Sequence, residues 1–330
     1  MQNQDNIDNI YNIIRLLGRG GFSNIYLVRN INNNTEYTAR VRREHINNYP
    51  QELQMTTNAS NLNNANIIHL HNHGIGILTR GGNIHNNIHY LIQDYCSKGD
   101  LFQYNFLGRF TEQHSKLIFR KILNGVGALH GAGICHRNLK LETILLDQNF
   151  NPKISNFTFA TMFQGNNGII NLNERVGTIP YMPPQMFNNT IYNGSKADIF
   201  SLGVILFNLV TGKIGFKRAT NEDLYYRHIR NNNINQYWNQ LANHINFNLS
   251  QEFKNLYIRM VSFNENNRPT INQILNDIWF NEITGLNNQQ LIQLENNVRH
   301  EFSTREAQIQ ANANMQPLMI NINEEFDDNH

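Results

Sequence analysis

The sequence has few charged residues and almost no cysteine. Charged residues make up 16% of the 330 residues, below the roughly 25% that is usual for soluble proteins. The 27 Lys and Arg residues against 25 Asp and Glu residues leave a formal net charge of +2, which gives no reason to expect nucleic acid as a partner. Cys96 and Cys135 can build neither a disulfide framework nor a cysteine-rich metal site, which favours a reducing compartment.

Targeting and membrane-spanning segments are also missing from the sequence. Residues 1–10, MQNQDNIDNI, contain no basic or apolar stretch of the kind that a signal peptide needs. The longest apolar run, around residues 200–210, is too short to cross a bilayer. We therefore expect a cytoplasmic protein with no membrane partner.

Amide side chains take the place of the missing charge. The chain has 59 asparagines and 20 glutamines, together about a quarter of its residues. Such a bias can mark a disordered tract. However, 40% of the residues are hydrophobic and asparagine runs never exceed three residues, so we expect a folded core.

The spacing of apolar residues changes at about residue 100. Before this point, strands are predicted over 13–17, 24–28 and 35–41, a helix over 52–62, and two short strands near 67–70 and 89–93. After it, helices are predicted over 114–129, 197–211, 251–261 and 271–276. The sequence therefore predicts an α+β protein of two lobes, 10–95 and 96–281, between a tail (1–9) and a C-terminal helix with an acidic tail (282–330).

A glycine-rich segment, Gly18-Arg19-Gly20-Gly21, joins the first two predicted strands. Because glycine has no Cβ, the backbone N–H groups of such a turn can approach phosphates closely. By itself the segment could equally be a plain hairpin turn. The segments that follow it make the phosphate-binding interpretation more specific.

The segments are, in chain order, LGRGGFSNI (17–25), YTARV (37–41), LIQDYC (91–96), KGDLF (98–102), HRNLKLET (136–143), KISNFT (153–158), VGTIPYMPPQ (176–185), ADIFSLG (197–203) and NRPT (267–270). Together they resemble the Ser/Thr type of the protein kinase superfamily, closest in pattern to calcium/calmodulin-dependent-like kinases. The resemblance covers residues 10–281 and implies a bilobal fold with a β-rich N-lobe and a larger helical C-lobe. It also implies that 91–96 is the hinge, 136–143 the catalytic loop and 153–158 the metal-binding loop.

The resemblance also implies a nucleotide site, but with departures. Ser23 stands at the third glycine, and Arg40 stands where the family has its phosphate-binding lysine; a planar guanidinium is not a conservative replacement for an ammonium. Glu52 is the expected helix partner of Arg40, although a count without a gap falls on Met55 and an exposed Glu52 fits the sequence equally well. The implied cofactor-binding positions are Leu17, Gly18, Gly20, Gly21, Ser23, Ile25, Thr38, Arg40, Glu52, Asp94, Cys96, Asp100 and Leu145.

Three positions that phosphoryl transfer needs carry other residues. Asn138 stands at the catalytic base, and an amide cannot usefully accept the substrate's proton. Thr143 and Asn156 stand at the two metal-ligand positions, so we expect no bound metal. Losing a general base alone costs about 10²- to 10⁴-fold in rate. The sequence therefore predicts a pseudokinase that requires no cofactor and binds ATP weakly and without metal, or not at all.

Two further substitutions fit this interpretation. Thr158 is β-branched where the family has a flexible glycine, and Gln185 replaces the glutamate that pairs with Arg268. At positions 138, 156 and 185 an acid has become an amide. In so amide-rich a chain, mutational drift explains these changes as well as selection for a new role does.

Other kinase positions are retained. Asp198 matches the buried anchor of the catalytic loop, and Lys140 is the Ser/Thr-type signature, with Thr178 as its expected hydrogen-bonding partner. Glu174 stands four residues before Thr178, where related kinases often carry a phosphothreonine, and we expect Arg137 to pair with it; a solvated Glu174 is the alternative. The apolar spine between the lobes matches His136, Phe157 and Leu70.

The C-terminal region lies outside the resemblance. Apolar residues spaced by three or four over 289–310 predict a helix. This helix could dock on the kinase-like body, form a short coiled coil or bind a partner, and we favour docking in cis.

Three functions follow from these predictions. The first is a pseudokinase scaffold or allosteric regulator with a protein partner. The second is a weakly active Ser/Thr kinase in which Arg40 binds phosphate. The third is a structural subunit of a larger assembly. The sequence does not identify the partner.

Overall fold

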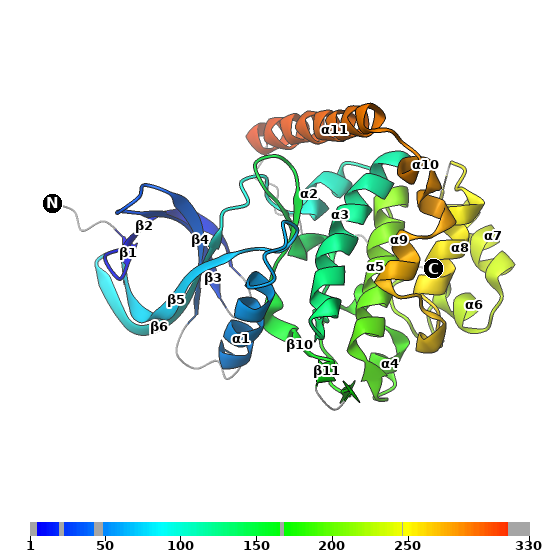
Figure 1. Cartoon of the computed structure of the whole chain (residues 1–330), viewed down its shortest axis with the longest axis horizontal. Helices are drawn as coiled ribbons and strands as arrows, with labels where there is room; N and C mark the ends of the chain where they lie inside the picture. Colours follow the sequence, from blue (N-terminus) through cyan, green and yellow to red (C-terminus); the bar gives the residue numbers. More distant parts are fainter. Residues whose placement is uncertain (1–4, 20–22, 43–48, 166–167, 246, 316–330) are drawn as a thin grey trace.

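The computed structural model describes residues 5–19, 23–42, 49–165, 168–245 and 247–315. It begins with an antiparallel sheet in the order β1-β2-β3-β4-β6-β5 (Figure 1). The two-residue β1 pairs with both β2 and β5, so the ring of strands closes. Residues 6–7, expected in a tail, therefore belong to the sheet. The strands are β1 (Asn6–Ile7), β2 (Tyr11–Arg19), β3 (Asn24–Asn30), β4 (Glu36–Arg42), β5 (Leu70–Arg80) and β6 (Asn83–Asp94).

Alternating side chains build the interior of this sheet. Successive residues of a strand point to opposite faces, so Tyr26 and Val28 of β3 pack with Ala39 and Val41 of β4 in one buried cluster. This alternation is the signal that predicted the strands at 24–28 and 35–41. The same geometry places every second residue of β4 on a common face, which positions part of the candidate site.

The β5–β6 hairpin corrects the prediction of two short strands. The strands have 11 and 12 residues. Gly81 (φ 56°) and Gly82 (φ 78°) form the turn between them with positive φ angles that favour glycine. The outer face of β5 carries exposed polar residues such as His71 and His73, so the apolar alternation that marks a strand is weak there.

Helix α1 (Tyr49–Ser60) lies beside the sheet (Figure 1). It contacts β5 and the 3₁₀ turn Phe157–Phe159. The helix begins three residues before the predicted start at 52. Glu52 lies on its buried side and is fully inaccessible to solvent, which places a carboxylate between the sheet and the rest of the chain.

The chain after residue 100 is mainly helical and has a hydrophobic core of its own. Helices α3 and α5 contact each other at its centre (Figure 1). The predicted helices correspond to α3, α5, α8 and α9, whereas the short α2, α4, α6, α7 and α10 were not predicted. The helices are α2 (Leu101–Phe106), α3 (Glu112–Gly131), α4 (Pro184–Phe187), α5 (Gly194–Thr211), α6 (Tyr226–Arg230), α7 (Ile234–Ala242), α8 (Gln251–Met260), α9 (Ile271–Leu275), α10 (Asn281–Thr284) and α11 (Asn288–Met315).

Helix α5 is longer than the apolar run that the sequence analysis considered. With 18 residues it is long and apolar enough to cross a membrane by length and composition alone. However, 89% of this stretch is buried inside the protein. A helix that is apolar on all sides is expected at the centre of a core, which accounts for its composition.

Short two- and three-residue strands and 3₁₀ turns shape the loops between the long helices. β7 pairs with β10, β8 with β9, β11 with β12, and β13 with β14. They are β7 (Ile134–Cys135), β8 (Ile144–Leu146), β9 (Pro152–Ile154), β10 (Thr161–Met162), β11 (Gln164–Gly165), β12 (Gly168–Ile169), β13 (Asn171–Leu172) and β14 (Tyr192–Asn193). The 3₁₀ turns are Leu141–Thr143, Phe157–Phe159, Ile179–Tyr181, Glu265–Asn267 and Ile278–Phe280.

The C-terminal helix α11 docks on the helical part of the same chain (Figure 1), as favoured from the sequence. Leu294, Val298 and Phe302 are buried in the main core. Arg305 is 8% exposed, and its guanidinium donates hydrogen bonds of 2.6–2.8 Å to the carbonyl oxygens of residues 104, 108 and 109. Residue 104 lies in α2, and residues 108 and 109 lie just after it. Arg305 of α11 therefore also stabilises the C-terminal end of α2.

Acid is expected to weaken the docking of α11 through Glu301. Burial alone would raise the pKa of Glu301, but hydrogen bonds from His114 and Arg305 outweigh it and lower the pKa below its ordinary value. A carboxyl whose pKa is lowered by folding stabilises the fold above its ordinary pKa of about 4.3 and loses this effect as the pH falls through the lower value. We expect the difference in unfolding free energy between wild type and Glu301→Gln to shrink from pH 5 to pH 3 in urea titrations. A difference that stays constant would contradict this.

Candidate functional site

The glycine-rich segment begins at the end of β2 and precedes β3 in the sequence. Gly18 pairs with Ile25 across the two strands, and Ile25 in turn pairs with Arg40 of β4. Leu17 is half-buried and Ser23 is buried. Gly20 and Gly21, expected to contact phosphate, lie outside the described residues. Of the two strands that flank the segment, β3 is therefore the one that adjoins the strand of Arg40.

Arg40 joins three elements of the site. Its Nε donates to Oγ of Ser23 at 3.0 Å, and its Nη1 donates to Oδ1 of Asn156 at 3.1 Å. The same Nη1 lies 3.0 Å from Oε1 of Glu52. The expected Arg40–Glu52 pair is therefore formed, and with a buried rather than an exposed Glu52. Burial lowers the pKa of Arg40, although Glu52 opposes this.

A second arginine, which the sequence analysis missed, shares this carboxylate. Arg42 is 2% exposed, forms an ion pair with Glu52 and donates to Oγ1 of Thr158 at 3.2 Å. Within the part of the chain that the structure describes, its Nε and Nη1 have no hydrogen-bond partner. Since residues i and i+2 of a strand share a face, the spacing from Arg40 could have placed Arg42 at the same site.

Asn156 and Thr158 complete this group from the helical side. Asn156 has a left-handed backbone (φ 67°, ψ 70°), which asparagine adopts more readily than most residues. Oγ1 of Thr158 lies 2.7 Å from Oδ1 of Asn156 and 3.0 Å from Oε1 of Glu52. Thr158, which stands at the expected glycine position, therefore contributes a hydroxyl that contacts both Asn156 and Glu52. We call Arg40, Arg42, Glu52, Asn156 and Thr158 the Glu52 cluster.

Asp198 of α5 holds the catalytic-loop segment. Its carboxylate accepts the backbone N–H groups of His136 and Arg137, both at 2.8 Å. Arg137 has a φ of 61°, which is uncommon for a residue other than glycine. The two hydrogen bonds fix this bend in place, so Asp198 fills the anchoring position that the resemblance implied.

Two of the three spine residues are in contact. The rings of His136 and Phe157 lie 5.3 Å apart, and His136 is within 2.8 Å of the carbonyl oxygen of Ser155. Burial lowers the pKa of His136. Leu70 is half-buried at the start of β5.

Asn138 is buried and its side chain faces Thr178 of the segment 163–185, which we call the activation segment. Its Oδ1 accepts a hydrogen bond from the hydroxyl of Thr178 at 3.0 Å. This corrects the predicted Lys140–Thr178 pair: the ammonium of Lys140 lies 3.6 Å from the carboxylate of Glu142. A neutral amide at 138 does not attract a lysine, whereas Glu142 offers it a negative charge.

The glycine before Thr178 explains how the two loops come so close. Gly177 has a φ of 111°. A Cβ at this position would lie 2.7 Å from the carbonyl oxygen of Arg137. Only glycine therefore fits without moving the backbone, and this contact sets the approach of Thr178 to Asn138.

The oxygens at the two expected metal-ligand positions are engaged in internal hydrogen bonds. The hydroxyl of Thr143 accepts from the N–H of Lys140 at 3.1 Å and lies 2.9 Å and 3.2 Å from the carbonyl oxygens of Lys140 and Asn138. Oδ1 of Asn156 accepts from Arg40 and Thr158. Across the described ranges, no group of three or more His, Cys, Asp or Glu side chains could hold a metal ion.

Asp94 lies in the hinge at the end of β6, and its side chain is tied to β5 and β9. Its carboxylate accepts the N–H of His69 at 3.2 Å and lies 2.8 Å from Nε2 of His71 and 3.1 Å from the ammonium of Lys153. Burial would raise the pKa of Asp94, but His71 and Lys153 outweigh it and lower the pKa. Asp94 therefore acts as a fixed anion at the hinge.

The other expected nucleotide positions have mostly structural contacts. Asp100 caps α2 by accepting the N–H of Gln103 at 3.0 Å, and burial raises its pKa. Cys96 is buried, which raises its pKa to about 12. Leu145 is half-buried and pairs with Asp100 through the backbone in an isolated β-bridge. Thr38 is half-buried in β4.

Gln185 lies beside Arg268, as the resemblance implied. Nη2 of the fully buried Arg268 donates to Oε1 of Gln185 at 2.7 Å, and Nε2 of Gln185 donates to the carbonyl oxygen of Phe263 at 2.7 Å. Burial lowers the pKa of Arg268 to about 10. The amide therefore uses both its oxygen and its nitrogen here.

Arg137 and Glu174 form the expected pair in the activation segment. Nη1 of Arg137 lies 2.6 Å from Oε2 of Glu174, and its Nε donates to the carbonyl oxygen of Phe159 at 2.7 Å. Burial would lower the pKa of Arg137, but the hydrogen bond to Glu174 outweighs it and raises the pKa. The Arg137 side chain is 3% exposed and that of Glu174 is 63% exposed.

Reversing the charge at Glu174 is expected to loosen this segment. Glu174→Arg would place a second cation beside a buried guanidinium and should lower the unfolding free energy by about 1–2 kcal/mol, an amount limited by the exposure of Glu174. Limited proteolysis should then cut residues 164–176 faster. Glu36→Arg, which reverses another exposed glutamate paired with an arginine, is the matched control. Equal behaviour of the two variants would contradict the pairing.

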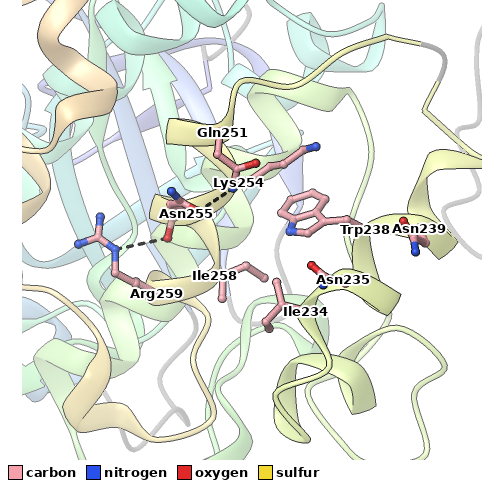
Figure 2. A pocket seen from close by; sticks show the side chains of 9 residues that line it. All are labelled: Ile234, Asn235, Trp238, Asn239, Gln251, Lys254, Asn255, Ile258 and Arg259. Atoms are coloured by element: carbon pink, nitrogen blue, oxygen red, sulfur yellow. Dashed lines mark hydrogen bonds between the residues drawn. The ribbon is translucent and has the colours of Figure 1, made fainter.

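A separate pocket lies between α7 and α8, at the end of the helical part away from the sheet (Figures 1 and 2). Its volume is about 670 Å³. The Lys254 ammonium lies 5.4 Å from the centre of the Trp238 ring. None of the expected site residues lines this pocket, so it is not part of the candidate site. The lining residues are Ile234, Asn235, Trp238, Asn239, Gln251, Lys254, Asn255, Ile258 and Arg259.

The chain is similar to a known protein family and to several curated proteins. Residues 11–280 match the family model described as protein kinase domain. The serine/threonine-protein kinase chk-1 of Caenorhabditis briggsae is 28% identical over 286 residues, which cover 82% of this chain and 53% of the relative. CBL-interacting protein kinase 5 of Oryza sativa subsp. japonica is 28% identical over 281 residues, 82% of this chain and 56% of the relative. The chain spans about half the length of the curated relatives it matches.

Proposed function

The chain belongs to the protein kinase family, and we propose that it is a Ser/Thr-type pseudokinase that acts as a scaffold or allosteric regulator without transferring phosphate. Asn138 carries this proposal. Its Oδ1 holds the Thr178 hydroxyl at 3.0 Å in the place of a catalytic carboxylate. Because an amide does not take up a substrate proton, the base position offers no activation of a hydroxyl. In this proposal residues 10–95 and 96–281 are the two lobes of the kinase fold.

The metal-ligand positions support the same function. Mg²⁺ prefers anionic oxygen ligands, whereas Oδ1 of Asn156 is neutral and already accepts from the Arg40 guanidinium at 3.1 Å. Against a kinase rate of roughly 1–100 s⁻¹, the missing base alone costs about 10²- to 10⁴-fold. The loss of both metal ligands comes on top of this cost.

ATP is not required for this role. Any ATP that binds does so weakly and without a metal. A thermal-shift titration with ATP, with and without Mg²⁺, tests this part of the proposal. A rise in melting temperature that depends on Mg²⁺ would contradict it.

A weakly active kinase is the alternative that one observation favours. Arg40 retains a positive charge and lies beside Ser23 at the edge of the glycine-rich turn, where it could contact a phosphate. This alternative predicts slow phosphate transfer that depends on Arg40. Incubation with labelled ATP separates the two functions.

The partner of the proposed regulator is a protein in the cytoplasm. If the chain is instead a structural subunit, it should purify in a stable complex of several proteins rather than with one regulated enzyme. Affinity purification of the full chain, followed by mass spectrometry and sizing of the complex, separates these two roles. Recovery of the free chain alone would contradict both.

A further inference from the structure

A second hollow adjoins the pocket between α7 and α8. The two hollows, of about 670 Å³ and about 450 Å³, share Trp238 and Lys254 as lining residues. Because they share these side chains, we treat them as one surface and call it the α7–α8 groove. Most of the other side chains of the second hollow are apolar, namely those of Leu241, Ala242, Ile245, Phe247 and Leu249.

The half-buried Trp238 lies between apolar and charged neighbours in this groove. Figure 2 shows Ile234 and Ile258 on one side of its ring and the Lys254 side chain on the other. The Lys254 ammonium lies 5.4 Å from the centre of the ring. The groove therefore offers an aromatic surface, on which another ring can pack, directly beside a cation.

The groove has cations but no carboxylates of its own. No aspartate or glutamate of the described residues lines either hollow. Within the same part of the chain Lys254 forms no ion pair, since its charged contact is the Trp238 ring. Arg259 points away from this ring (Figure 2) and pairs with Asp277. The groove thus suits an acidic ligand that carries an apolar anchor.

One segment of this chain has that chemistry. Residues 324–328 read Glu-Glu-Phe-Asp-Asp, so two carboxylates lie on each side of one aromatic residue. No other stretch of five residues in the sequence carries four carboxylates. The segment lies outside the described residues. Its charge and its single phenyl ring complement Lys254 and Trp238.

The position of α11 prevents this segment from reaching the groove of its own chain. The helix starts next to α10, and its other end lies far from α7 and α8 (Figure 1). Its 28 residues span about 42 Å. The 11 residues from Met315 to Phe326 span at most about 40 Å when fully extended. A tail that must run back along the whole helix is therefore too short.

We propose that the α7–α8 groove binds residues 324–328 of a second copy of this chain. Phe326 packs against Trp238, and the flanking carboxylates face Lys254 and the amides at the rim of the groove. The contact joins different surfaces of the two copies, so it is heterologous and extends into rings or open chains. The inference goes beyond the proposed function and does not depend on whether catalysis is lost.

Sedimentation velocity of the full chain tests the proposal. The average mass should rise with protein concentration, with a dissociation constant on the order of 10–100 µM, because one buried ring and a few exposed ion pairs carry the contact. Raising the ionic strength from about 0.05 M to about 0.5 M should weaken the association, since salt screens exposed charges.

Two variants of the full chain separate the groove from the tail. Lys254→Glu, which changes the groove, and Phe326→Ala, which changes the tail, should each weaken self-association by at least about tenfold. A mixture of the two should form a pair of one copy each, because one variant keeps an intact tail and the other an intact groove. Arg29→Glu makes the same change in net charge on the sheet, far from the groove, and should associate like wild type.

A synthetic peptide of residues 321–330 gives a second readout that does not rely on the Lys254 variant. Labelled at its N-terminus, it should bind the full-length Phe326→Ala chain in a fluorescence anisotropy titration. The same peptide with alanine in place of Phe326 should bind at least about tenfold more weakly. Equal binding of the two peptides would overturn the assignment of the phenyl ring as the anchor.

The other results that would overturn the inference are equally direct. They are a wild-type chain that stays monomeric up to about 200 µM, variants that associate as wild type does, and a mixture of the two variants that does not pair while the peptide does not bind. Each would leave the pseudokinase proposal standing, because that proposal rests on Asn138 and not on this groove.

Discussion

Replacing Glu52 by glutamine is expected to lower the free energy of unfolding by about 3–5 kcal/mol. Glu52 is fully buried and is shared by Arg40 and Arg42. Glutamine keeps the shape and one acceptor oxygen but leaves two buried guanidinium groups without their carboxylate. Urea unfolding followed by circular dichroism measures the change.

The matched control for this substitution is Glu36→Gln on the same sheet. Glu36 pairs with Arg29 at 2.7 Å, but its side chain is 37% exposed, so its loss should cost less than about 1 kcal/mol. If Glu52→Gln were no more destabilising than this control, the two arginines would not depend on the shared carboxylate and the account of the Glu52 cluster would be wrong.

Replacing Phe302 by alanine is expected to cost about 3–5 kcal/mol as well. Phe302 is 1% exposed. Its ring lies 5.2 Å from that of Tyr104 and 5.3 Å from those of Phe110 and Phe150, and it stacks on Phe150. Alanine would leave a cavity between α11 and the helical body, and urea unfolding should show the loss.

Ile292→Ala, in the same helix, serves as the control for Phe302→Ala. Ile292 is 59% exposed, so its truncation should change stability by no more than about 0.5 kcal/mol. Amide hydrogen exchange should become faster along α11 in the Phe302 variant only. Indistinguishable exchange in the two variants would mean that docking in cis does not hold the helix.

The helices could be predicted better than the strands. α3 and α5 have long apolar patterns with the period of a helix, and their predicted cores at 114–129 and 197–211 lie inside the observed bounds. The β5–β6 hairpin was predicted too short, because exposed histidines and asparagines hide the alternation on its outer face. The spacing of apolar residues reflects which side chains are buried. In a half-buried strand this spacing is less regular, so the strand is harder to predict.

The site could be predicted only where the residues themselves identify a partner. The Arg40–Glu52 and Arg137–Glu174 pairs join opposite charges, and both are formed. The contact of Arg42 with Thr158 links residues 116 positions apart; the strand spacing from Arg40 could have indicated the site of Arg42, but not this partner. The Lys140 pairing was wrong because Glu142 nearby attracts the lysine instead of Thr178.

The amides at the three positions where the resemblance implies acids differ in their hydrogen bonds. Asn138 and Asn156 accept hydrogen bonds through their oxygens, a role that a carboxylate could also fill. Gln185 uses its oxygen for Arg268 and its nitrogen for the carbonyl of Phe263, and a carboxylate could not donate that second bond. The amide nitrogen therefore has a specific use at 185.

Phosphate transfer from labelled ATP is the most direct test of the central claim. The purified full chain is incubated with Mg²⁺ or Mn²⁺ and generic Ser/Thr substrates, and Arg40→Ala serves to identify contaminating kinases. The account predicts no incorporation above that of the Arg40 variant, into substrate or into the chain itself. Incorporation by wild type that disappears in Arg40→Ala would show that the chain is a working kinase and would contradict the account.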